Sequence, residues 1–168
     1  MGAIFTLYTP LEPSIYSLGG IFLALAMLLV AQLYHYILNV QWFFRVSLFV
    51  ELVLVLAIVI FIFYEYTYQT ALLMYIGYQV TFVFGSYLIR TETLLLKTDT
   101  LLSKIDSAKQ LGYLAGMALS YLFYKLLTHQ NITQNQEQIY ILHYLLLALE
   151  IIIILSVLKS FKTIHAKV

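Results

Sequence analysis

Glu150 is the residue of this chain whose position points most strongly to chemistry. It lies inside the continuous apolar run 139–158. An ionisable side chain at the centre of a bilayer costs roughly 2.5 kcal/mol or more, and such groups are usually retained for function. The alternative interpretation is an interhelical hydrogen bond that fixes helix packing. Both interpretations stay open for Glu150 from the sequence alone.

Three further polar residues lie deep in apolar segments: Gln79, Glu51 and His143. His143 and Glu150 are seven residues apart, so on a helix they share one face. A proton or cation pathway requires such groups along one path. We therefore treat all four as candidates for a substrate or ion pathway, with packing hydrogen bonds as the alternative.

The composition identifies the broad class of the protein. Of 168 residues, 62% are hydrophobic and only 10% are charged, whereas a soluble domain carries about 25% charged residues. The net charge of +1 gives no basic patch for nucleic acid. Cysteine is absent, which excludes thiol redox chemistry, disulfides and cysteine-ligated metals. We expect an integral membrane protein with the lipid bilayer around it, without a cofactor or a metal site.

Hydropathy predicts an all-α, polytopic helix bundle that forms a single membrane domain over residues 1–168. A helix of about 20 apolar residues crosses the hydrocarbon core, and lipid-exposed backbone must be helical to satisfy its polar groups. The five predicted spans are Ser17–Leu38, Val46–Tyr64, Thr70–Ile89, Gln110–Leu127 and Ile139–Leu158.

The basic residues predict the direction of these spans. With five spans, one side of the membrane carries only Lys125, and the other side carries all remaining lysine and arginine residues: Arg45, Arg90, Lys97, Lys104, Lys109, Lys159, Lys162 and Lys167. Basic residues concentrate in cytoplasmic loops. We therefore expect the N-terminus outside and the C-terminus in the cytoplasm.

The long loop 90–109 is expected on the cytoplasmic side. Its leucines alternate with charged residues, which suits either a short amphipathic helix on the membrane surface or a charged linker. Ser107–Gln110 resembles a capping box that opens the fourth span. Arg90 and Glu92 close the third span; they are candidates for a cytoplasmic gate contact, or for interfacial anchors and a surface ion pair.

Small residues recur at every fourth position of the fourth span, at Gly112, Gly116 and Ser120. Such a ridge allows two helix backbones to approach closely. It predicts helix packing and carries no information on a substrate.

Two segments carry a family resemblance. Phe82–Lys97 (FVFGSYLIRTETLLLK) is similar to the end of a fourth or tenth helix of the major facilitator superfamily, and Asp106–Lys125 (DSAKQLGYLAGMALSYLFYK) resembles a fifth or eleventh helix. The resemblance implies that the chain corresponds to five helices of one six-helix half. Members of that family rock two halves around a midplane site, so the resemblance also implies a homo-oligomer or other membrane subunits as partners.

These observations predict a partial or half-size secondary transporter that moves a small solute or ion. The alternative is a non-catalytic structural or assembly subunit of a larger membrane complex. An enzyme is not expected, because no metal-binding, paired-aspartate or nucleophile–base arrangement stands out. The expected location is a bacterial inner membrane or another energy-transducing membrane.

Overall fold

The computed structural model describes residues 11–64 and 67–165, and every regular element within them is an α-helix. Lys167, one of the residues used to orient the chain, lies outside this range. The helices are α2 (Pro13–Gln32), α3 (Tyr34–Ile37), α4 (Val40–Phe63), α5 (Tyr68–Leu96), α6 (Asp99–His129) and α7 (Asn135–His165). The all-α prediction is therefore confirmed for the described residues.

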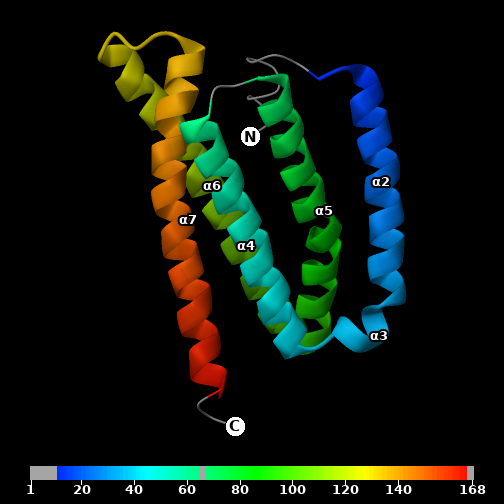
Figure 1. Cartoon of the computed structure of the whole chain (residues 1–168). Helices are drawn as coiled ribbons and strands as arrows, with labels where there is room; N and C mark the ends of the chain where they lie inside the picture. Colours follow the sequence, from blue (N-terminus) through cyan, green and yellow to red (C-terminus); the bar gives the residue numbers. More distant parts are fainter. Residues whose placement is uncertain (1–10, 65–66, 166–168) are drawn as a thin grey trace.

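The five long helices run alternately up and down between two ends of the bundle (Figure 1). In the view of Figure 1, α2, α5, α4 and α7 follow one another across the front, and α6 passes behind α4 and α7. Helix α5 packs against both α2 and α4, and α4 packs against α7. Helix α6 contacts the bundle mainly through α5.

Four helices in the described part of the chain are long and apolar enough to cross a membrane: α2, α4, α5 and α7. Many of their large apolar side chains lie on the outer surface; Phe22, for example, is 62% exposed and Leu29 is 61% exposed. Such a surface is suited to lipid rather than to water. The structure is thus compatible with an integral membrane protein.

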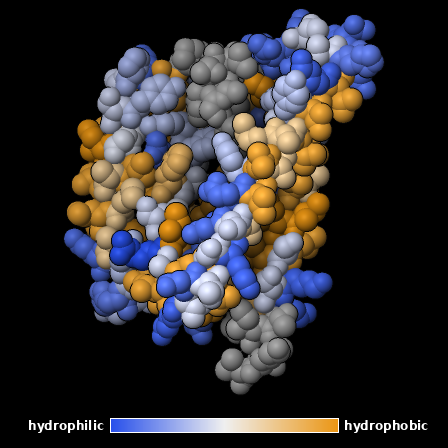
Figure 2. All heavy atoms as spheres, turned by 180° about the vertical axis from the view of Figure 1, so that it is seen from behind, coloured by the Kyte–Doolittle hydropathy of each residue, from blue (hydrophilic) through white to orange (hydrophobic). Residues whose placement is uncertain are grey.

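Helix α6 is long enough to span a bilayer but is not among these four. Its first half carries Asp99, Lys104, Asp106 and Lys109, which lowers its apolar character. Figure 2 shows the rear face, where hydrophilic residues gather along the lower edge and at the tip between α6 and α7. The fifth span, and with it the orientation of the termini, stays a prediction.

Four of the five predicted spans correspond to longer helices, whereas the first, Ser17–Leu38, is wrong as one continuous helix, because α2 ends at Gln32 and the short α3 begins at Tyr34. The second predicted span begins at Val46, whereas α4 begins at Val40; the third ends at Ile89, whereas α5 continues to Leu96. A polar cap explains the earlier start of α4. The Asn39 side chain accepts a hydrogen bond from the Trp42 backbone N–H at 3.0 Å, which satisfies one of the free donors at the start of α4.

The segment 90–109 forms helix, but not a separate one. Helix α5 runs to Leu96, Lys97 adopts a left-handed conformation with φ of 49°, and α6 then continues without a break from Asp99 to His129. The capping box predicted at Ser107 is therefore wrong, because Ser107 lies in the interior of α6. The first part of α6 is polar and the rest is apolar, so the change in polarity near Ser107 resembled the start of a helix.

The turn between α6 and α7 is a Schellman motif. Asn131 has a φ of 66°, its N–H donates to the Thr128 carbonyl at 3.1 Å, and the Ile132 N–H donates to the Leu127 carbonyl at 3.0 Å. Asparagine tolerates this left-handed position better than most residues. The turn directs α7 back along the bundle, antiparallel to α6.

The basic residues gather at one end of the bundle. The first turns of α4, the last turns of α5, the first half of α6 and the last turns of α7 all lie at the lower end in Figure 1. These are the segments that carry the lysines and arginines assigned above to one side of the membrane, apart from Lys97, which lies at that end between α5 and α6, and Lys167, which lies outside the described residues. The folded chain thus keeps the charge asymmetry on which the predicted orientation depends.

Candidate functional site

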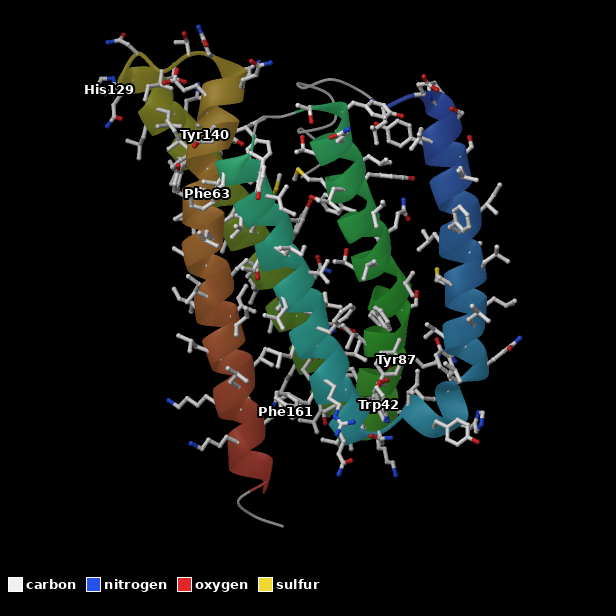
Figure 3. All side chains as sticks on the ribbon, viewed as in Figure 1. Trp42, Phe63, Tyr87, His129, Tyr140 and Phe161 are labelled. Atoms are coloured by element: carbon white, nitrogen blue, oxygen red, sulfur yellow. The ribbon has the colours of Figure 1, made fainter. Side chains whose placement is uncertain are left out.

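The interface between α4 and α7 runs along most of both helices. Near the upper end, the Tyr140 hydroxyl donates to the Ile62 carbonyl at 3.2 Å. Near the lower end, the Phe161 ring lies 4.7 Å from the Phe44 ring. Figure 3 shows Tyr140 and Phe161 at these two ends of α7. Side chains that point into this interface between the two contacts are therefore covered by both helices.

Glu51 of α4 and Glu150 of α7 meet at this interface. Their carboxyl groups lie close enough to each other to interact, and both side chains are half-buried. At 1.5 Å per residue, Glu51 lies about 16 Å from the start of α4 and Glu150 about 22 Å from the start of α7. We call these two residues the carboxyl pair. The sequence placed both residues in apolar segments, but only the fold brings them together.

A hydrogen bond within the carboxyl pair would require a proton. An ionised carboxylate only accepts hydrogen bonds, so one of the two groups must be protonated to donate. Two unit charges about 4 Å apart would repel by about 4 kcal/mol at an effective dielectric constant of about 20. A proton on one of the two groups would remove this repulsion and allow a hydrogen bond between them. In the described residues, the second oxygen of Glu150 (Oε2) is buried without a hydrogen-bond partner.

The surroundings of the carboxyl pair favour a proton over a metal ion. No group of three or more histidine, aspartate, glutamate or cysteine side chains that could hold a metal occurs in the described part of the chain. Divalent cations in proteins need several oxygen or nitrogen ligands. A proton needs only the two carboxyl groups themselves.

His143 lies on the same interface, two helical turns from Glu150. Its ring is 2% exposed and lies 4.0 Å from the Phe61 ring. Its Nδ1 is 2.7 Å from the Ile139 carbonyl, which can only accept, so Nδ1 carries a proton. Its Nε2 has no hydrogen-bond partner among the described residues. These contacts are those of a packing residue, and a role in the predicted pathway stays a prediction.

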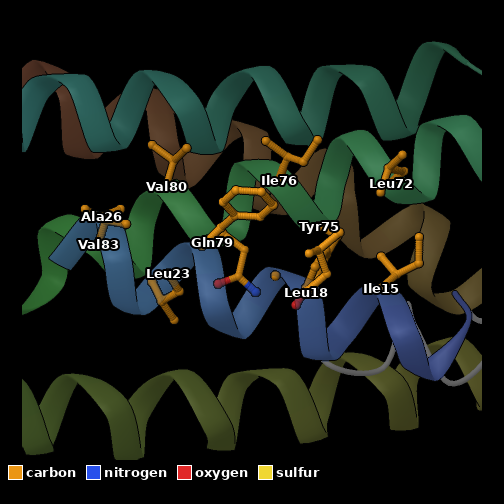
Figure 4. A pocket seen from close by; sticks show the side chains of 12 residues that line it. Ile15, Leu18, Leu23, Ala26, Leu72, Tyr75, Ile76, Gln79, Val80 and Val83 are labelled. Atoms are coloured by element: carbon orange, nitrogen blue, oxygen red, sulfur yellow. The ribbon is translucent and has the colours of Figure 1, made fainter. Parts of the chain in front are cut away.

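Gln79 is not brought to the carboxyl pair. It lies on α5 in a groove between α2 and α5, shown in Figure 4. The groove has a volume of about 460 Å³ and an almost entirely apolar lining. Three of the four predicted pathway residues thus lie at the α4–α7 interface, and the fourth lies in a separate groove.

Arg90 and Glu92 do not pair with each other. Glu92 accepts from the Lys109 ammonium group at 2.7 Å, which links α5 to α6. The Arg90 guanidinium lies 5.7 Å from the centre of the Tyr34 ring, at the start of α3. Each residue contacts a different neighbouring element, and the predicted gate role remains a prediction.

The small-residue ridge of α6 faces open space. A Cβ atom added at Gly112 or at Gly116 would meet no described atom within 4 Å, and Ser120 is half-buried. The predicted packing partner of this ridge is therefore not among the described residues. A glycine of α5 does pack against a neighbouring helix: a Cβ added at Gly77 would lie 3.7 Å from a Val53 methyl group on α4.

Sequence reasoning missed two residues that position the helices. Gly19 of α2 faces Tyr75 of α5 so closely that an added Cβ would lie 2.5 Å from Tyr75 Cε1. Tyr87 of α5 is completely buried, and its hydroxyl donates to the Ile37 carbonyl at 2.6 Å. Neither residue has a local signal, because the chain has seven glycines and fifteen tyrosines and their roles depend on which helices become neighbours.

No protein-family model matches the chain, no curated protein is significantly similar to it, and no solved structure matches it significantly. The fold and the carboxyl pair therefore define its class: a helical protein with membrane-length apolar helices and two neighbouring carboxyl groups between two of them.

Proposed function

We propose that the chain is a membrane transport protein in which the carboxyl pair binds and releases a proton while a small solute or ion is moved. The observation that supports this function is the close approach of the Glu51 and Glu150 carboxyl groups, at a depth where both helices are apolar. Ionisable residues inside membrane helices are expensive and typically belong to ion pathways or proton relays.

The carboxyl pair offers a direct link between protonation and helix packing. With a proton bound, the two carboxyl groups attract α4 to α7 through a hydrogen bond. With the proton lost, two negative charges repel in a medium of low polarity. Loss of the proton thus favours separation of α4 from α7, and a transport cycle can use this change to open a path between them.

The chain requires additional helices for alternating access. Secondary transporters typically place their site between two structural repeats that move against each other. The major facilitator resemblance suggests that this chain supplies five helices of one repeat. We therefore propose that it acts as a homo-oligomer or together with other membrane subunits.

The experiment is proton flux in proteoliposomes that contain the purified full chain. A pH gradient is imposed, and proton influx is read from a pH-sensitive dye trapped inside. We expect influx with the wild-type chain and its loss in Glu51→Gln and in Glu150→Gln. Glu137→Gln is the matched control, because Glu137 lies on the same helix as Glu150 but is exposed.

A loss of proton flux is informative only if the variant assembles like the wild-type chain. We expect every variant to elute from size-exclusion chromatography in mild detergent at the same volume as the wild-type chain. Wild-type influx no greater than that of protein-free liposomes would contradict proton movement by the chain alone or as a homo-oligomer, and equal influx in wild-type and Glu150→Gln would contradict the role of the carboxyl pair.

A structural or assembly subunit is the second candidate function, and helix α6 favours it. Its apolar residues are largely uncovered, with Leu111, Leu114 and Leu119 each about two-thirds exposed. An uncovered apolar helix with a small-residue ridge suits contact with other membrane helices. If Glu150→Gln disrupts assembly and the wild-type chain carries no proton flux, this second function is the correct one.

A further inference from the structure

The groove between α2 and α5 has the composition of a lipid-binding site. We call it the α2–α5 groove; α2 contributes Leu18, Phe22 and Leu23 to its lining, and α5 contributes Ile76 and Val80. Its volume of about 460 Å³ falls within the usual range for small-molecule sites, which are mostly apolar with a few polar groups that fix orientation.

Gln79 supplies an unused hydrogen-bond acceptor in this groove. Its amide lies between α5 and α2 in the close view of Figure 4. The side-chain carbonyl oxygen (Oε1) is buried and has no hydrogen-bond partner among the described residues. A carbonyl oxygen can only accept a hydrogen bond, and leaving it unpaired in an apolar setting is costly. The group that completes this site is therefore a hydrogen-bond donor.

The depth of Gln79 limits which molecules can supply that donor. At 1.5 Å per residue, Gln79 lies about 16 Å from the first residue of α5 and about 25 Å from the last. The charged headgroup of a phospholipid stays at the membrane surface and does not reach this depth. The donor must belong to a molecule that can carry it into the apolar interior.

Among the described residues, none that lines the groove is charged, so a charged ligand would find no partner in that lining. Its rim is open to the outer surface of the bundle, because Leu18 is 51% exposed, Phe22 is 62% exposed and Ile76 is 51% exposed. In a membrane this surface faces lipid, and a ligand can enter sideways from the bilayer.

We infer that the α2–α5 groove binds one uncharged lipid with an apolar body and a hydroxyl group that donates to Oε1 of Gln79. Long-chain and isoprenoid alcohols have this chemistry. The inference depends on the groove and on Gln79, and it is independent of the carboxyl pair and of the proposed transport function.

The test is photo-crosslinking of the purified full chain in mild detergent. The probe is hexadecanol with a photoactivatable diazirine in its chain, and the matched probe is its methyl ether, which lacks the donor. Peptide mass spectrometry then locates the label. At limiting probe concentration we expect about tenfold more labelling of α2 and α5 by the alcohol than by the ether, as expected for one hydrogen bond in an apolar site.

Two variants separate recognition from folding. Gln79→Leu removes the acceptor, so the preference for the alcohol is expected to disappear. Gln110→Leu makes the same change at an exposed glutamine of α6 and is expected to keep the preference. Ala26→Leu narrows the groove from the α2 side and leaves residue Gln79 unchanged, so both probes are expected to label the protein less.

The inference is overturned if the alcohol and the ether label the wild-type chain equally, or if Gln79→Leu retains the preference. If Gln79→Leu does not fold, Ala26→Leu decides: unchanged labelling by both probes in that variant would equally overturn the inference.

Discussion

Replacing Gly19 by alanine tests the contact between α2 and α5 most directly. Gly19 lies where the α2 backbone meets the Tyr75 ring, and an added Cβ would lie 2.5 Å from Tyr75 Cε1 and still closer to the hydroxyl oxygen. Real Cβ atoms essentially never approach so closely. The Tyr75 ring must therefore move away from α2 in Gly19→Ala.

The structure allows the size of the effect to be worked out. Tyr75 donates a hydrogen bond of 3.2 Å to the Tyr16 carbonyl, worth about 1 kcal/mol. Its ring also packs edge-on against the Tyr16 ring, with 5.3 Å between centroids, which contributes about 0.5–1.5 kcal/mol. Alanine recovers about 1 kcal/mol through its higher helix propensity. We expect Gly19→Ala to lower the free energy of unfolding by about 1 kcal/mol.

The adjacent glycine provides the control. A Cβ at Gly20 would meet no described atom within 4 Å, so Gly20→Ala gains helix propensity without a clash and is expected to be neutral or stabilising by up to about 1 kcal/mol. Unfolding is measured by SDS titration in mixed micelles, followed by the fluorescence of Trp42, the single tryptophan. If the two variants have equal stability, the proposed α2–α5 contact is refuted.

Three further predictions test other contacts. Tyr87→Phe removes the hydroxyl that donates to the Ile37 carbonyl and should lower the free energy of unfolding by about 1 kcal/mol in the same titration; no change would show that this contact is absent. A double-mutant cycle of Glu92→Gln and Lys109→Met should give a coupling energy of about 0–1 kcal/mol, because the Lys109 side chain is 49% exposed; a larger value would contradict this surface placement. Gly116→Leu should reduce the native mass in mild detergent if the α6 ridge forms an oligomer contact, and an unchanged mass would count against that contact.

The membrane-length helices were predictable because the signal for them is local. A run such as 139–158 must be helical in lipid, whatever its neighbours are, since its backbone polar groups have no other partners. Helix ends were less predictable. Hydropathy marks only the part of a helix that is apolar enough for lipid, whereas α5 and α6 continue into polar residues that water can accommodate.

The sequence by itself determined that the chain is rich in long apolar helices, that basic residues concentrate at one end, and that Glu150, Glu51, His143 and Gln79 are polar groups in apolar segments. These properties depend on residue type and spacing along one helix. Only the tertiary structure decided that Glu51 meets Glu150 while Gln79 lies in a different groove. The reason is physical: in an apolar segment most helix faces are similar. Close packing such as that of the Tyr75 ring against the α2 backbone at Gly19, and not a local pattern, therefore selects which helices become neighbours.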